Sequence, residues 1–264
     1  MNNIAVLIDF TEGSKAALKQ AASIAQKAKA NLFAVHIVAT QDKVEQAEAE
    51  LATFLNSSNI TNIEVKPIIG VGSLAPACNS TFNKINADLV LICTHGVKGM
   101  FQQLFGAQIL KLIQAISYPC LVISEHTKVD LSEVKSILFP IGPHPDFMIK
   151  IKQTTTLAKF LNASILIYEI DRNGADPEQW LSKNLEASRK YFTENEISFS
   201  KVLEELSSFS VGFSRQTLDY ASKNSIPIMS MMATVSNNDN LFGYGDKENF
   251  LVNNHGISIL TCNA

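Results

Sequence analysis

The amino-acid sequence predicts an α/β protein made of two similar domains in tandem, each a parallel sheet with helices on both faces. Short apolar segments typical of buried strands alternate with segments whose apolar residues recur at helical spacing. The same order of segments then begins again shortly after residue 133. Strand–helix alternation of this kind is typical of a three-layer α/β/α architecture.

Composition agrees with a folded protein and argues against several classes of function. The chain has 264 residues, of which 46% are hydrophobic and 18% charged, so a substantial core can form. A net charge of −3 without any basic block argues against a nucleic-acid partner. No apolar segment approaches the roughly 18 residues of a membrane span, and residues 1–4 lack the features of a signal peptide. We therefore expect a cytoplasmic protein with no membrane partner.

The four cysteines give no sign of a disulfide framework or a metal site. They stand at positions 78, 93, 120 and 262, without a Cys-x-x-Cys pair and without a metal-like cluster with histidine. Three lie within or beside apolar segments, which predicts buried thiols in a reducing compartment. We expect no metal bound by the protein itself.

Each element of the first half follows from its residue pattern. The continuous apolar segment 4–8 predicts a strand covered on both faces, and the helix after it extends to about Lys29. The polar segment 127–133 is interpreted as a linker. Further strands are expected at 32–38, 63–69, 89–93 and 121–124, and further helices around 44–54, 74–85 and 109–116.

A constant offset relates the two halves. Adding 133 places segment 4–8 on 137–141, and adding 137 near the C-terminus places Leu104-Phe105-Gly106 on the identical triplet Leu241-Phe242-Gly243. A net change of four residues over that length is small. We therefore predict two domains, residues 1–127 and 128–264.

The most informative stretch of the first half joins the expected fourth strand to the fourth helix. Five apolar residues end at Cys93, glycines follow at 96, 99 and 106, and a helical pattern begins after the last of them. Glycine lets the backbone approach a ligand closely, and a helix start offers free N–H groups and partial positive charge. This favours a phosphate site. An ordinary strand–helix loop with extra glycines explains the spacing equally well.

The same stretch resembles the nucleotide-binding signature of the universal stress protein family. That signature is a Gly, two residues, a Gly, nine residues, a Gly and then Ser or Thr. Here Cys93 stands at the first Gly, Gly96 and Gly106 hold the second and third, and Ala107 replaces the hydroxyl residue. Three further features are typical of the family: the lead-in Thr94-His95-Gly96, the extra Gly99 and the strand at 119–123.

The resemblance implies a fold, a ligand and a set of contacts. Each domain is expected to have strand order 3-2-1-4-5, in the adenine nucleotide alpha hydrolase-like fold, with a crevice at the carboxyl ends of strands 1 and 4. The implied ligand is ATP or AMP, with Mg²⁺ if it is ATP. The residues carried over as nucleotide-binding candidates are Leu7, Ile8, Asp9, Ile37, Ile92, Cys93, Gly96, Gly99, Gly106, Ala107 and Gln108.

Asp9 has a second interpretation, and Ala107 is expected to lower the affinity for nucleotide. Asp9 is expected beside the adenosine, although an Asp after a strand is often a turn or helix-cap residue. Its expected place opposite the Gly-rich loop favours the ligand. Ala107 lacks a hydroxyl whose hydrogen bond to a charged group is worth roughly 1.5–3 kcal/mol, which corresponds to about 10- to 100-fold in affinity. Backbone N–H groups remain, so binding is expected to be weak.

The second half lacks the same features. Gly142 stands at the position of Asp9, Ala233 at Gly96, Ser236 at Gly99 and Tyr244 at Ala107. The Gly243-Tyr244-Gly245 triplet is interpreted as a turn. We expect this domain to keep the fold and not to bind nucleotide in the family's way.

These observations give one expected function and two alternatives. The sequence has no Walker-type or Gly-x-Ser-x-Gly motif, its five histidines show no ligand spacing, and His36 is interpreted as packed. With no catalytic residue assigned, we expect a non-enzymatic stress-response or regulatory protein that binds ATP or AMP weakly in its first domain. The alternatives are a nucleotide-free pseudo-dimeric scaffold or binder of another small ligand, and, disfavoured by the missing groups, an ATP-using enzyme.

The family also pairs domains through the fifth strand. In this chain the corresponding segments are 121–124 and 257–260, which we expect to meet antiparallel within one molecule and so to close two exposed edges. A homodimer is a further assembly that this pairing leaves open.

Overall fold

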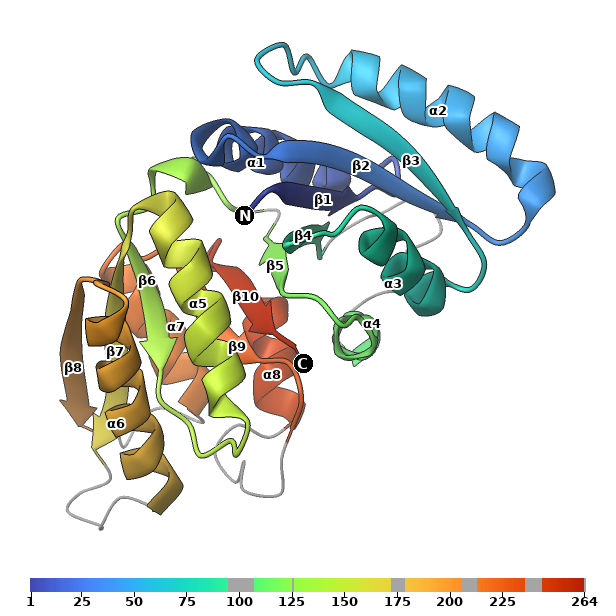
Figure 1. The fold of residues 1–264 in the computed structure, drawn as a ribbon. Coiled ribbons are helices and arrows are strands. Elements are labelled where there is room, and N and C mark those ends of the chain that lie inside the picture. Colours follow the sequence, from blue (N-terminus) through green and yellow to red (C-terminus); the bar gives the residue numbers. More distant parts are fainter. Residues whose placement is uncertain (95–106, 125, 172–178, 206–212, 236–243, 264) are drawn as a thin grey trace.

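A computed structural model describes residues 1–94, 107–124, 126–171, 179–205, 213–235 and 244–263. Its ten strands form one sheet in the order β3-β2-β1-β4-β5-β10-β9-β6-β7-β8 (Figure 1). The first five strands have the order 3-2-1-4-5, and the last five repeat that order as 8-7-6-9-10. Two units of the expected α/β/α fold therefore share this sheet, and the predicted fold class is confirmed.

The strands and α-helices of the two halves correspond one to one. The first half contains β1 (Asn3–Leu7), α1 (Glu12–Ala28), β2 (Asn31–Val38), a short 3₁₀ helix η1 (Gln41–Lys43), α2 (Val44–Ser57), β3 (Val65–Val71), α3 (Leu74–Lys84), β4 (Leu89–Cys93), α4 (Ala107–Ala115) and β5 (Cys120–Ile123). After η2 (Leu131–Glu133), the second contains β6 (Ser136–Pro140), α5 (Phe147–Leu161), β7 (Ser164–Asp171), α6 (Gln179–Glu194), β8 (Phe199–Glu205), α7 (Phe213–Lys223), β9 (Ile228–Met232), α8 (Tyr244–Leu251) and β10 (Ser258–Cys262).

The central strands are buried on both faces, as their continuous apolar sequences require. In β1, Ile4 and Val6 belong to one core cluster and Ala5 and Leu7 to the other, because successive side chains point to opposite faces. Apolar residues of α1, α2, α5 and α6 complete the first cluster, and those of α3, α4, α7 and α8 complete the second. Each cluster contains residues of both halves, so the core is continuous across the molecule.

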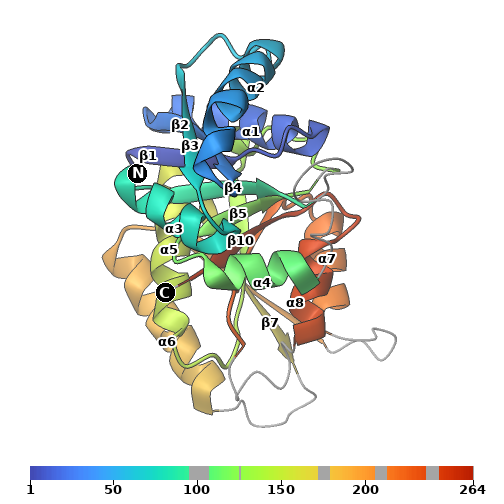
Figure 2. The ribbon, with the colours of Figure 1, turned by 90° about the vertical axis from the view of Figure 1, so that its right-hand side faces the viewer.

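The two halves meet at β5 and β10, which are antiparallel neighbours in the middle of the sheet. Val122 is paired with Ile259 and Leu121 with Leu260, whereas the other neighbouring strands of the described residues run parallel. Around this seam α4 contacts α8 (Figure 2) and α1 contacts α5. Neither β5 nor β10 is an edge strand, so the sheet's two edges are β3 and β8.

Asn263, just after β10, reaches across the seam to the first half. Its side-chain amide donates to the carbonyl oxygens of Ile113, at 3.0 Å, and Tyr118, at 3.1 Å. Gln153 of α5 in turn donates to the Asn263 carbonyl oxygen, at 2.6 Å. Since Asn263 is buried, these bonds satisfy backbone groups that water cannot reach.

The interpretation of 127–133 as a polar linker was wrong in part. The segment includes η2, where Leu131 is fully buried against the core. The side chain of Gln20 on α1 donates to the Val129 carbonyl oxygen and accepts from the Leu131 N–H, both at 2.8 Å. Lys27 also donates to the carbonyl oxygen of Ser132. One apolar residue and three hydrogen bonds thus hold this connection against α1.

Candidate functional site

The carboxyl ends of β1 and β4 lie side by side, because these two interior strands are parallel neighbours. The two strands are parallel neighbours, with Val6 paired with Leu91. Asp9 follows the end of β1 by two residues, and Cys93 is the last residue of β4. Since β2 and β5 flank this pair on opposite sides, the chain leaves β1 and β4 in opposite directions. That topology opens a crevice at the strand ends.

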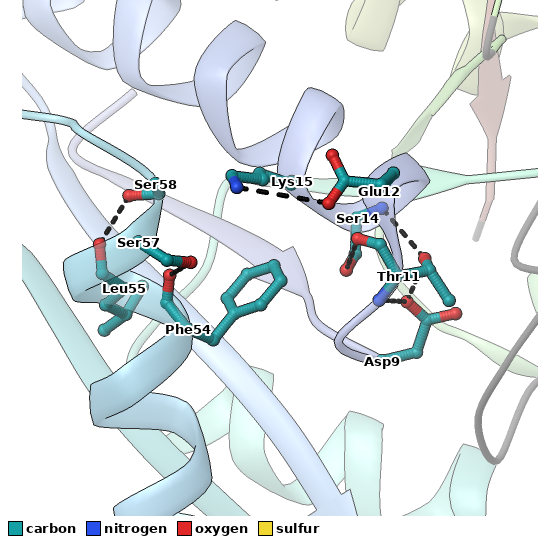
Figure 3. Close-up of polar contacts among 9 residues, drawn as sticks. All are labelled: Asp9, Thr11, Glu12, Ser14, Lys15, Phe54, Leu55, Ser57 and Ser58. Carbon is teal, nitrogen blue, oxygen red and sulfur yellow. Dashed lines mark hydrogen bonds and ion pairs between the residues drawn. The ribbon is translucent and has the colours of Figure 1, made fainter.

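Asp9 is part of a hydrogen-bonded turn that starts α1 (Figure 3). Its Oδ1 accepts from the Thr11 N–H at 3.1 Å and from the Thr11 hydroxyl at 2.5 Å. Thr11 is the N-cap of α1, since its Oγ1 accepts from the Ser14 N–H at 3.1 Å. The intervening Phe10 has a φ of 64°, which this tight turn imposes. The turn interpretation of Asp9 is therefore confirmed, and its contact with a ligand stays a prediction.

His36 is a packed residue, as predicted. It is 5% exposed, and its Nδ1 lies 2.8 Å from the carbonyl oxygen of Ile8. Because a carbonyl oxygen only accepts, Nδ1 carries the hydrogen. The His36 ring contacts that of Phe10 at 4.5 Å, and Phe10 in turn packs edge-on against Phe54. These contacts hold together the β1–α1 turn, β2 and α2.

Four apolar candidates offer a ligand only their backbone. Leu7, Ile8, Ile37 and Ile92 are each at most 5% exposed, with their side chains inside the two core clusters. Cys93 is half-buried and is the most exposed of the four cysteines. These five residues lie in or just after three neighbouring strands, β2, β1 and β4, as the predicted crevice requires. Their contact with a nucleotide stays a prediction.

The Gly-rich loop itself lies outside the described residues, and with it Gly96, Gly99 and Gly106. The described chain resumes at Ala107, the first residue of α4, and Gln108 follows in the first turn. The apolar face of α4, with Ile109, Leu110 and Ile113, packs in the same core cluster as Leu7 and Ile92. The helix thus packs on the same face of the sheet as α3 and α8, which it contacts.

Comparison with known proteins assigns the first half of the chain to a protein family. Residues 1–124 match the model of the universal stress protein family. The first half of the chain is therefore a universal stress protein domain. The matched residues span β1 to β5 and therefore contain the whole crevice described above.

Solved universal stress proteins share the fold of both halves. One from Archaeoglobus fulgidus is 12% identical, with a TM-score of 0.65 over 99% of this chain and 96% of that chain. A putative one from Pseudomonas aeruginosa is 14% identical, with a TM-score of 0.58 over 100% of this chain and 93% of that chain. At these identities the likeness concerns the fold alone. A search of curated protein sequences found no match.

The second half has the same strand arrangement at its crevice but different residues. β6 and β9 are parallel neighbours, with Leu138 paired with Met229. Gly142 follows β6 where Asp9 follows β1, and Ala233 after β9 is fully buried. Helix α8 begins at Tyr244 as α4 begins at Ala107, which matches the offset of 137. The interpretation of Gly243-Tyr244-Gly245 as a turn was wrong for Tyr244 and Gly245, because they are the first residues of α8.

Two buried lysines at this second crevice were missed by the sequence analysis. Lys150 of α5 and Lys247 of α8 are each 3% exposed. The Lys150 ammonium donates to the carbonyl oxygen of Pro140, at 2.5 Å, and that of Lys247 to the carbonyl oxygen of Met232, at 2.8 Å. These carbonyls end β6 and β9, the two strands that line the crevice.

A sequence signal for Lys150 existed. It lies at helical spacing from Phe147 and Thr154, both buried on the inner face of α5, so a lysine there predicts a buried charge. At the matching positions the first half has Ala17 and Leu110, which carry no charge. The two crevices therefore differ in chemistry as well as in sequence.

Among the described residues, no group of three or more His, Cys, Asp or Glu side chains is placed to hold a metal ion. No described helix is long and apolar enough to cross a membrane. All four cysteines are free thiols. Burial raises the pKa of Cys78 and of Cys262 to about 12, and it raises the pKa of Cys120 as well.

Proposed function

We propose that this protein is a non-enzymatic, cytoplasmic stress-response or regulatory protein whose first half binds ATP or AMP weakly. One observation carries the proposal: within a universal stress protein domain, the carboxyl ends of β1 and β4 are neighbours, which brings Asp9 and Cys93 to the same side of the crevice region. The Gly-rich sequence leaves that side from Cys93 and ends at the start of α4. A strand, a Gly-rich loop and a helix start are the parts that an anion site of this kind needs.

Seven of the candidates have a distinct part in the proposed complex. The backbone at Ile8 and Ile37 faces the base and ribose, together with the Asp9 carboxylate. The backbone N–H groups at Gly96, Gly99 and Gly106 hold the phosphates, and Gln108 adds a polar contact. Mg²⁺ would be bound chiefly by the phosphate oxygens of ATP, since this ion is usually held through substrate phosphates and few protein ligands.

Two features make the proposed binding weak. Ala107 lacks the hydroxyl of the family signature, so one hydrogen bond to a phosphate is missing. Asp9 already accepts two hydrogen bonds from Thr11, which hold its carboxylate in the turn. A ligand donor must therefore compete with Thr11 for Oδ1.

Calorimetric titration of the whole chain with AMP, ATP and ATP with Mg²⁺ tests the proposal. We expect saturable binding of at least one of these ligands, weakened by Asp9→Asn, which removes the charge and keeps the oxygen that bonds Thr11. Asp130→Asn is the matched control, because Asp130 accepts from the Ser132 N–H at 2.9 Å in a similar turn away from the crevice. Wild-type protein that gives no heat up to millimolar ligand would contradict nucleotide binding.

A nucleotide-free scaffold is the second candidate, favoured by the continuous ten-stranded sheet. Here the paired halves imitate a dimer, and the chain acts through a partner or as a homodimer. A homodimer in light scattering, together with calorimetric titrations in which AMP and ATP give no heat, would favour this scaffold. In either case we expect no ATP hydrolysis. Turnover of ATP that is lost in Asp9→Ala would contradict the non-enzymatic part of both proposals.

A further inference from the structure

The sheet ends at two edge strands, β3 and β8, which differ in how open their edges are. Among the described strands, each has a neighbour on one side only. In Figure 1, β8 is the outermost strand of the second half. An edge strand presents backbone N–H and C=O groups with which another chain can pair, and many proteins block such edges.

The edge of β3 is blocked by a proline. The Gly72 N–H donates to the carbonyl oxygen of Val38 on β2, at 2.9 Å. Because backbone groups alternate in direction along a strand, those of Pro67, Ile69 and Val71 point away from β2. Pro67 has no N–H, so this edge lacks a donor near its start. Pairing of another strand along β3 is therefore disfavoured.

The edge of β8 contains no proline. The Ile165 N–H on β7 donates to the carbonyl oxygen of Ser198, at 2.9 Å, so the backbone groups of residues 198, 200, 202 and 204 face β7. Those of Lys201, Leu203 and Glu205 point outward. Leu203 is 56% exposed, the highest value for a large apolar side chain among the described residues. This edge can therefore form both backbone hydrogen bonds and an apolar contact.

We infer that β8 is the interface of a homodimer, in which it pairs antiparallel with β8 of a second copy and Leu203 lies opposite Leu203. In this register Lys201 of each copy lies opposite Glu205 of the other. Opposite charges at directly opposite positions stabilise an antiparallel pair. The outward backbone groups of all three residues match, so each opposed pair exchanges two hydrogen bonds.

The charges select this register over its neighbours. A shift of one residue would oppose outward backbone groups to inward ones. A shift of two residues places Leu203 opposite either Lys201 or Glu205 and breaks both charge pairs. Lys201 also forms an ion pair with Glu169 of its own chain. Since an ammonium group has three donors, it can hold Glu169 and the Glu205 of the second copy together.

The carboxylate of Glu205 has a further reason to attract a lysine. Glu205 is the register partner of Asp171 on β7, so two acidic residues are neighbours at the end of this edge. Like charges at such positions destabilise a sheet, and Lys201 of the second copy would bring an opposite charge to both. The interface specifies the homodimer that the proposed function leaves open, and it does not depend on nucleotide binding.

Sedimentation velocity of the whole chain without nucleotide, over a concentration series, tests the inference. We expect the wild type to form a reversible species of twice the 28.9 kDa chain mass. Leu203→Lys places two like charges opposite each other, so we expect monomer alone at the same concentrations. Val71→Lys is the matched control, because Val71 is 41% exposed at an outward position of the other edge strand. It should leave the dimer intact.

Exchanging the charges tests the register. Lys201→Glu opposes two carboxylates at each charge pair, and we expect weaker association. Adding Glu205→Lys to Lys201→Glu restores opposite charges between the copies, and we expect the dimer to return. Repulsion between residue 201 and Glu169 is present in both variants, so the comparison isolates the contact between copies.

Three results would overturn the inference: a monomeric wild type, a dimer that survives Leu203→Lys, or a double variant that associates no better than Lys201→Glu alone. Circular dichroism checks that each variant is folded. Should a variant at residue 201 fail to fold, Leu203→Lys and Val71→Lys decide the question by themselves. A calorimetric titration without heat would contradict nucleotide binding and leave this interface unaffected.

Discussion

Gln114 and Ala233, which are 119 positions apart, are joined by a hydrogen bond of 2.9 Å from the Gln114 side-chain amide to the Ala233 carbonyl oxygen. Gln114 lies on α4, the helix that follows the proposed phosphate loop, and Ala233 occupies the position in the second half that corresponds to Gly96. The helix of one crevice thus contacts the strand end of the other. The halves are joined by side chains at this seam as well as by the pairing of β5 with β10.

The seam contributes measurably to stability. Asn263→Ala removes both hydrogen bonds from the Asn263 amide and leaves the Ile113 and Tyr118 carbonyls without them. We expect the free energy of unfolding to fall by about 2 kcal/mol, since each lost bond costs about 0.5–1.5 kcal/mol and buried unsatisfied groups add to this. Urea unfolding measures the change. Asn254→Ala, at an exposed position, is the control, and equal midpoints for the two variants would contradict the role of Asn263.

The connection between the halves is held by Gln20. Gln20→Ala removes its hydrogen bonds to Val129 and Leu131, so residues around Lys128 should open more often. A local loss of about 1–2 kcal/mol corresponds to roughly 5- to 30-fold faster tryptic cleavage after Lys128. Gln26→Ala, at an exposed position of the same helix, should leave the cleavage rate unchanged. Equal rates in both variants and the wild type would show that Gln20 does not hold the connection.

Thiol labelling should single out Cys93. Thiols react as thiolates, and with a pKa of about 12, roughly one in 10⁴ of the Cys78 and Cys262 side chains is ionised at pH 8. We expect one fast-reacting thiol per chain at pH 8, lost in Cys93→Ser. Because Cys93 lies at the proposed nucleotide crevice, saturating ATP should slow its labelling. A fast thiol that persists in Cys93→Ser would contradict the assigned burial.

Restoring the family hydroxyl should strengthen nucleotide binding. Ala107→Ser adds a donor at the first residue of α4, and we expect affinity for ATP to rise about 10- to 100-fold, the equivalent of roughly 1.5–3 kcal/mol. Tyr244→Ser is the matched control, because Tyr244 begins α8 at the corresponding position without a Gly-rich sequence before it. Calorimetry compares the two. An unchanged affinity in Ala107→Ser would contradict the proposed position of a nucleotide phosphate at the start of α4.

The sequence predicted the fold well because its signals are local or repeated. The continuous apolar segment 4–8 and its repeat at 137–141 form most of β1 and β6. The docking of 127–133 could not be predicted in the same way. It depends on one buried residue, Leu131, and on Gln20, which is distant in sequence and close only in the folded chain.

The candidate site was predictable in outline but not in detail. The strand order implied by the family resemblance was enough to place Asp9 and Cys93 at the neighbouring carboxyl ends of β1 and β4. The hydrogen bonds from Thr11 to Asp9 depend on the positive φ of Phe10. No sequence pattern predicted that backbone conformation. The buried Lys150 and Lys247 were overlooked because lysine is normally a surface residue, and only the inward spacing of Lys150 argued otherwise.

The central claim is that nucleotide binds at the crevice of the first half and not at that of the second. A crystal structure of the whole chain, crystallised with millimolar ATP and Mg²⁺, tests this claim most directly. We predict nucleotide density at the edge formed by β1 and β4, with the base beside Asp9 and the phosphates at the start of α4, and no nucleotide at the corresponding edge of β6 and β9. Nucleotide bound beside Gly142 and Tyr244, or a first crevice without nucleotide in such crystals, would contradict the account.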